Sequence, residues 1–140
     1  MEDGWTPLVS AACGGHTAAI EALGKLGADV NRAAKDGRTP VYAVVEVGHS
    51  AAIEALCKLG ADVNLALDID VTPLFAAAFA GHTAVIETLG QLGADVNLAA
   101  KDGRTPVYAA VQGGHTAAIE ALGKLGADIN LADKNGSTSM

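Results

Sequence analysis

The sequence predicts an all-α solenoid in which one helix–turn–helix unit is repeated four times, with β-turns connecting the units. Threonine recurs every 33 residues, at Thr6, Thr39, Thr72, Thr105 and Thr138. Gly-His pairs keep the same step at residues 15–16, 48–49, 81–82 and 114–115. The chain is 50% hydrophobic but only 4% aromatic, so small aliphatic side chains must form its core. One helix pair cannot bury its own apolar face, and stacking of neighbouring units supplies the core.

The elements of a unit can be read in order from the second copy. Thr39 is a helix-capping residue and is followed by proline, which is favoured at the first helical position. A short helix is expected from Val41 to about Val47, and Gly48 supplies a left-handed exit. The second helix starts at residues 49–50 and ends at Gly60, with Ile53, Leu56 and Leu59 on one face. Residues 61–64 then lead into the next turn.

The unit boundaries follow from the period. The 140 residues divide into units at about 4–36, 37–69, 70–102 and 103–135, followed by a partial fifth turn. The first and last units keep interior-type apolar residues such as Ile20 and Ile119, and neither has the polar outer face of a capping unit. This pattern predicts either a segment of a longer array or chains that stack end to end.

The repeated motif Gly-x-Thr-Pro-Leu, Ala-Ala-x-x-Gly-His, Ile, Leu and Gly-Ala-Asp-Val-Asn resembles the ankyrin repeat over nearly the whole chain. The resemblance implies L-shaped units of two antiparallel helices with a projecting β-turn, stacked into a curved array. It also implies that the chain binds a partner protein through the turn tips and the concave face of the first helices. Near-identical units are typical of recent duplication or of a consensus-like engineered scaffold.

Two positions depart from the ankyrin pattern. The histidine expected after Thr-Pro-Leu is replaced by Val9, Tyr42, Phe75 and Tyr108. The second leucine of the usual Leu-Leu pair is replaced by Gly24, Cys57, Gly90 and Gly123. A glycine inside a helix costs about 1 kcal/mol relative to alanine and removes a core side chain. The leucines two positions later, Leu26, Leu59, Leu92 and Leu125, are expected to compensate in a slightly rotated helix.

Composition and motifs exclude several functions. The formal charge of −7 disfavours nucleic acid and anionic membranes as partners, and no apolar stretch is long enough to span a bilayer. Cys13 and Cys57 form no motif, which indicates a reducing, cytoplasmic location without a disulfide. No catalytic constellation, metal site or cofactor site is present, so an enzyme is not expected. The repeated histidines are interpreted as hydrogen-bonding residues at helix junctions, and the repeated aspartates as turn formers.

Positions that differ between the units are the candidates for contacting a partner. These residues are Trp5, Arg38, Tyr42, Glu46, Ile69, Val71, Phe75, Phe79, Arg104, Tyr108 and Gln112. The third unit is apolar here, whereas its neighbours carry arginines, and this combination is typical of interface hot spots. The aromatic rings also fit a packing role between turns. The predicted function is protein binding, and the alternative is a self-associating structural array.

Overall fold

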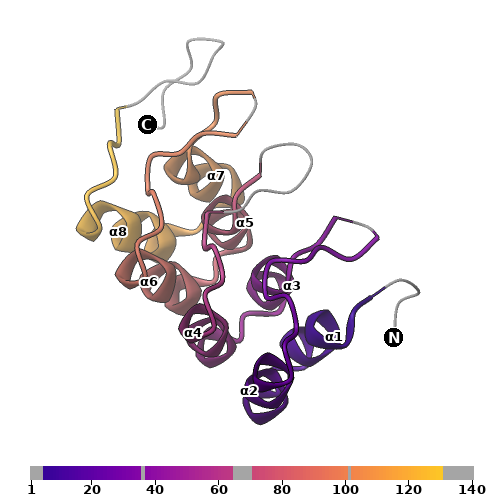
Figure 1. Ribbon diagram of the computed structural model, residues 1–140. Helices are drawn as coiled ribbons and strands as arrows, with labels where there is room; N and C mark the ends of the chain where they lie inside the picture. The colour runs from indigo at the N-terminus through magenta and orange to yellow at the C-terminus, as the bar shows by residue number, and fades with distance from the viewer. Residues whose placement is uncertain (1–4, 36, 65–70, 101, 131–140) are drawn as a thin grey trace.

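The computed structural model describes residues 5–35, 37–64, 71–100 and 102–130, which form helices and connecting loops but no strands. The helices are α1 Pro7–Cys13, α2 Thr17–Lys25, α3 Pro40–Val47, α4 Ser50–Lys58, α5 Pro73–Ala80, α6 Thr83–Gln91, α7 Pro106–Gly113 and α8 Thr116–Lys124. They stand in two rows (Figure 1). Each odd-numbered helix packs against the next odd-numbered one, and the even-numbered helices do the same. The predicted all-α repeat solenoid is confirmed.

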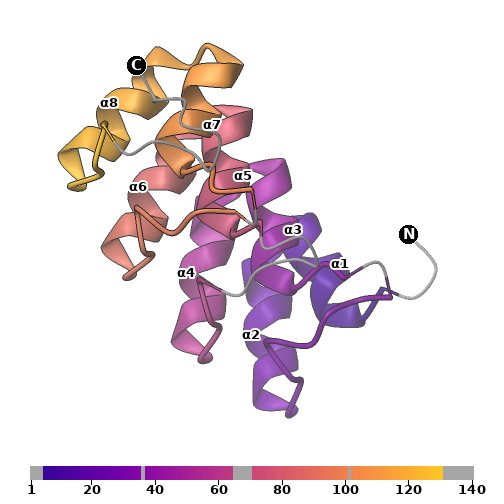
Figure 2. The same ribbon diagram turned by 90° about the horizontal axis from the view of Figure 1, so that it is seen from above.

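The coloured parts of the loops between α2 and α3 and between α6 and α7 project beyond the row of α1, α3, α5 and α7 (Figure 1). Seen from above, the helices of each row lie side by side along the stack (Figure 2). Before α3 the loop closes a turn, because the Gly37 N–H donates to the Ala34 carbonyl at 2.9 Å. The Ala34 N–H donates in turn to the Arg38 carbonyl at 2.8 Å. The predicted β-turn therefore brings Arg38 to the edge of the odd-numbered row.

The odd-numbered helices begin as the Thr-Pro motif predicts. In α5 the Thr72 hydroxyl oxygen accepts a hydrogen bond from the Phe75 N–H at 3.2 Å, and Pro73 is the first helical residue. The equivalent threonines cap α1, α3 and α7 in the same way. Gly48 ends α3 with a φ of 81°, the left-handed conformation that favours glycine. Local sequence therefore determines where these helices begin and end.

Replacing Thr72 with valine should lower the free energy of unfolding by about 1 kcal/mol, because the cap is lost while side-chain volume is retained. Thr72 is only 3% exposed, so water cannot replace the bond easily. Urea denaturation monitored by circular dichroism would measure the change. Thr83→Val is the matched control, because α6 has no side-chain cap. Equal losses in both variants would contradict the capping role.

A ladder of side-chain hydrogen bonds links the loops that follow the even-numbered helices. The Asp62 carboxylate accepts from the Asn64 N–H at 2.9 Å, as expected of a turn former. The Asn31 side-chain oxygen accepts from the Asp62 N–H of the next loop at 2.8 Å. The same inter-loop bond recurs at Asn64–Asp95 and Asn97–Asp128. The asparagines therefore join neighbouring helix pairs, a role that the sequence alone did not reveal.

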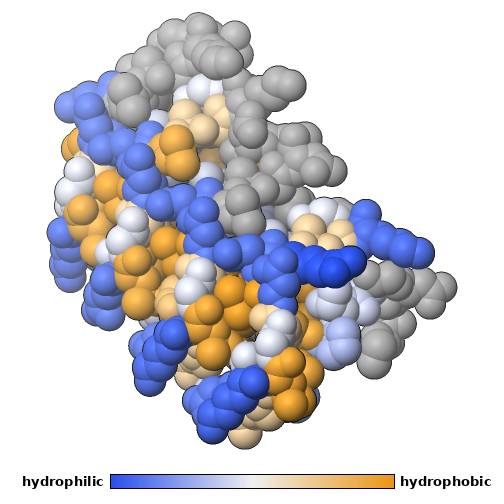
Figure 3. Space-filling model, viewed as in Figure 1, coloured by the Kyte–Doolittle hydropathy of each residue, from blue (hydrophilic) through white to orange (hydrophobic). Residues whose placement is uncertain are grey.

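Two glycines of the even-numbered helices, Gly24 and Gly90, each receive a leucine from the following helix pair. A Cβ atom at Gly24 would lie 2.5 Å from a Leu59 methyl carbon, and one at Gly90 would lie 2.5 Å from a Leu125 methyl carbon. The leucines thus compensate for the missing side chains, but they act between helix pairs. Cys57 interrupts the pattern, and Leu92, which lines a groove with it, stays 37% exposed. Hydrophobic side chains lie between charged ones over this row (Figure 3).

The histidines precede the even-numbered helices, as predicted, but their expected hydrogen-bonding role is wrong at the helix caps. None of these helices has a side-chain cap hydrogen bond from its histidine. Instead, the His49 ring lies where a side chain of Gly15 would be, 2.9 Å from a Cβ placed there. His82 and His115 occupy the same place over Gly48 and Gly81. Contact with a glycine of the preceding pair therefore positions these rings.

Candidate protein-binding surface

An arginine cluster lies on the exposed side of α3. Arg38 follows the turn before the helix, and its Nε donates to Glu46 Oε1 at 2.9 Å. Its guanidinium carbon lies 5.9 Å from the centroid of the Trp5 ring, within cation–π range. Arg38 and Glu46 are 35% and 41% exposed at their side chains. The positive charge of Arg38 at this surface is therefore neutralised by Glu46.

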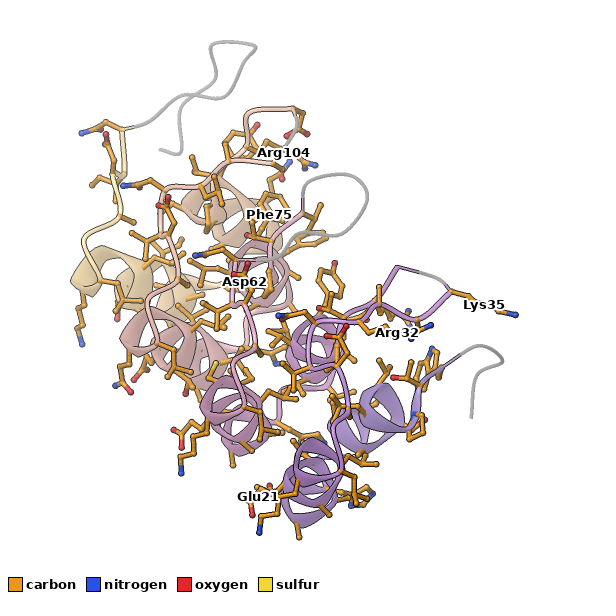
Figure 4. The ribbon with its side chains drawn as sticks, viewed as in Figure 1. Glu21, Arg32, Lys35, Asp62, Phe75 and Arg104 are labelled. Carbon is orange, nitrogen blue, oxygen red and sulfur yellow. The ribbon has the colours of Figure 1, made fainter. Side chains whose placement is uncertain are left out.

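A second arginine cluster lies beside α7. The Arg104 guanidinium lies 5.4 Å from the Phe75 ring centroid, and both side chains are labelled in Figure 4. Arg104 Nη1 donates to Gln112 Oε1 at 3.0 Å, and its Nε pairs with Asp102. The Arg104 backbone N–H also donates to Asp102, and this bond together with the guanidinium lowers the pKa of that carboxyl. Asp102 therefore stays ionised and neutralises Arg104.

Between the two clusters, the same positions are apolar. Arg38 and Glu46 are eight residues apart, as are Arg104 and Gln112, and each pair is joined by a hydrogen bond or ion pair. The third helix pair carries Val71 and Phe79 at these positions. In the middle of the surface, two apolar side chains thus replace the interacting polar pair found on either side. The sequence indicates that both positions vary between the units. Only the structure shows that the residue before the helix pairs with the residue near the helix end.

This apolar couple opens onto a groove of about 530 Å³, called here the Phe79 groove. It is lined by Tyr42, Glu46, Val71, Phe75, Ala76, Phe79, Ala80 and Arg104. Phe79 is 56% exposed, whereas Phe75 is 5% exposed and belongs to the core. Phe75 therefore fulfils the packing role predicted for the ring column. Phe79, in contrast, presents apolar surface to solvent.

Tyr42 contributes a polar group to the wall of the Phe79 groove. Burial raises the pKa of its hydroxyl, and the negative charge of Glu46 raises it further, while Arg38 opposes the effect. A tyrosine hydroxyl is already protonated at neutral pH, and the raised pKa extends this state to higher pH, so the group can donate a hydrogen bond. The groove thus combines apolar walls with one neutral donor and charges at its margins.

Most of the residues predicted to contact a partner lie in or beside the Phe79 groove. Trp5, Arg38 and Gln112 stand in the adjoining arginine clusters. Tyr108 is half-buried and is not among the lining residues. Ile69 lies outside the described residues. Ala76 and Ala80 line the groove but were missed, because small residues on an alanine-rich helix carry no distinguishing sequence signal.

Other kinds of site were sought in the same part of the chain. Within residues 5–35, 37–64, 71–100 and 102–130, no three His, Cys, Asp or Glu side chains gather to hold a metal ion. Cys13 and Cys57 are free thiols. None of the helices found there is both long and apolar enough to cross a membrane.

The stacked helix pairs, the projecting turns and the surface groove define a helical-repeat protein. A family model described as "Ankyrin repeats (3 copies)" matches residues 1–66 and again residues 66–133. The chain therefore belongs to the ankyrin-repeat family, as its motifs indicated. Ankyrin repeats are generally protein–protein interaction modules rather than enzymes. No protein of curated function matches this chain.

Proposed function

We propose that this chain binds a partner protein by receiving an apolar side chain of that partner in the Phe79 groove. The observation that carries the proposal is the 56% exposure of Phe79 on the wall of a groove of about 530 Å³. Exposed aromatic side chains in concave sites are the usual anchors of interface energy. The adjoining Val71 and Tyr42 extend the contact surface on either side of the ring.

The charge pattern around the groove supports an apolar anchor with a polar rim. Arg38 is paired with Glu46, and Arg104 is paired with Asp102 and Gln112, so neither arginine requires a carboxylate from the partner. Charged groups at the margin of an interface mainly affect association rate and specificity. The formal charge of −7 favours a partner with basic residues around its apolar anchor.

The outer ring of the proposed contact contains Trp5, Gln112 and Tyr108, and we also assign Ile69 to it, although that residue lies outside the described part of the chain. These positions vary between the units. Tyr108 and Gln112 lie on α7, and the first helices and turn tips are the partner-facing positions in ankyrin repeats. The free thiols of Cys13 and Cys57 favour a reducing compartment, so we place the interaction in the cytoplasm.

Phe79→Ala should weaken binding of a groove ligand at least tenfold, equivalent to about 1.4 kcal/mol. Ligands for the test are peptides selected on the immobilised protein from a random display library. Their dissociation constants would be measured by fluorescence anisotropy with the wild type and the variant. The exposure of Phe79 means that truncation should leave the fold intact, which circular dichroism can verify.

Val47→Ala is the matched control for this experiment. Val47 is an apolar residue with 41% exposure on the adjoining helix α3, but it does not line the groove. Its truncation should change affinity less than twofold. The proposal fails if peptides selected on the wild type bind Phe79→Ala with unchanged affinity, or if Val47→Ala weakens them equally.

A further inference from the structure

The interior of the stack repeats one interlocking contact between neighbouring helix pairs. Leu59 of α4 fits against Gly24 of α2, and Leu125 of α8 fits against Gly90 of α6. The leucine therefore comes from α4 or α8, and the glycine hollow lies in α2 or α6. Between α4 and α6 the contact is missing, because Cys57 replaces the glycine and Leu92 stays 37% exposed. The helices that make these contacts are closely packed, with α2 against α4 and α6 against α8.

At the α1–α2 end of the described stack, the inserting face is uncovered. Leu26 is 83% exposed, whereas its equivalents Leu59 and Leu125 are half-buried. Ala22 is exposed too, although its equivalent Ala55 in α4 is 3% exposed. This end therefore presents a leucine for which the described residues offer no hollow.

At the α7–α8 end of the described stack, no described residue covers the receiving face. A Cβ at Gly123 would meet nothing within 4 Å among the described residues. Val111 is 41% exposed, whereas its equivalent Val45 is 0% exposed, and Ile129 is 41% exposed against 7% for Val63. This end therefore presents the glycine hollow at Gly123 together with exposed apolar surface on Val111 and Ile129.

We infer that a second copy of the chain stacks its α1–α2 face on the α7–α8 face of the first, with Leu26 inserted at Gly123. Residues 17–29 and 116–128 have the same sequence, Thr-Ala-Ala-Ile-Glu-Ala-Leu-Gly-Lys-Leu-Gly-Ala-Asp. In the interior, α2 receives the leucine of α4, and α8 inserts its leucine into α6. Between two copies, α8 would receive a leucine as α2 does within the chain, and α2 would insert a leucine as α8 does within the chain. Because the two helices have the same sequence, both halves of the proposed contact already occur in this structure.

The contact is heterologous, because two different faces meet, and so each added copy exposes a further free face. Such contacts extend into open chains unless the rotation per copy closes a ring. Each copy carries a formal charge of −7, and the resulting repulsion is screened by salt. Association should therefore strengthen as ionic strength rises.

Light scattering on the full chain, from low micromolar to millimolar concentration, tests the inference. The mass should rise with concentration above 14.0 kDa and pass beyond twice that value. Leu26→Glu and Gly123→Leu each disable one face, and each should weaken association at least tenfold. Both positions are exposed and Gly123 has free space around it, so both variants should fold.

A mixture of the two variants identifies the contact. Each retains the face that the other lacks, so an equal mixture should form a dimer and stop there, whereas either variant alone stays monomeric. Phe79→Ala should associate like the wild type, which separates this contact from the proposed binding groove. A wild-type mass that stays at 14.0 kDa would overturn the inference, as would a mixture that remains monomeric or single variants that associate normally.

Discussion

Replacing Leu89 with alanine should lower the free energy of unfolding by about 3–4 kcal/mol. Leu89 is 0% exposed and lies on α6, between α4 and α8 in the middle of the even-numbered row. Truncation removes apolar contacts and leaves a cavity that its aliphatic neighbours can fill only in part. Urea denaturation of dilute protein, followed by circular dichroism, would give the change.

Leu26→Ala is the matched control, because the residue type and the substitution are the same but Leu26 is 83% exposed. Its effect on the free energy of unfolding should stay within about 0.5 kcal/mol at low protein concentration. A similar loss of stability in both variants would contradict the assignment of Leu89 to the shared core. No loss in Leu89→Ala would contradict it as well.

Gly81→Ala should lower the free energy of unfolding by about 2–3 kcal/mol through two separate costs. Gly81 has a φ of 79°, which costs a non-glycine residue roughly 1–2 kcal/mol. The new Cβ would also lie 2.5 Å from Nδ1 of His115 and displace that ring from its contact. Thermal or urea unfolding of the purified variant would measure the sum.

Gly93→Ala separates these costs. Gly93 has a φ of 95°, but a Cβ there would meet nothing within 4 Å among the described residues, so only backbone strain is expected. His115→Ala combined with Gly81→Ala should show less than the sum of the single effects, because the clash is removed. Equal effects of Gly81→Ala and Gly93→Ala would show that the ring contact has no energetic weight.

Much of the fold could be predicted because its signals are local and repeated. Thr72 and Pro73 specify the start of α5 through bonds within one helical turn, and Gly48 ends α3 for a reason that belongs to its own backbone. These signals recur at a constant step, so the stacked architecture followed from the period. The variable columns likewise indicated which surface differs between the units.

The candidate site needed the structure because its geometry depends on contacts across the stack. Val71 and Phe79 were recognised as apolar, but only the fold shows that they replace the arginine-centred couples of the neighbouring pairs. The sequence could not separate Phe75 from Phe79 as core and surface rings. Their burial depends on how α5 is turned between α3 and α7, which is a property of packing.

The amino-acid sequence by itself determined that this protein is an all-α ankyrin-repeat array, and it determined where its capped helices begin. Tertiary structure alone decided that Leu59 fits at Gly24, that Asn31 binds the next loop, and that His49 packs on Gly15. The physical reason is that capping and turn formation are settled by neighbours in the chain. Contacts between repeats depend on the offset at which one rigid helix pair rests on another.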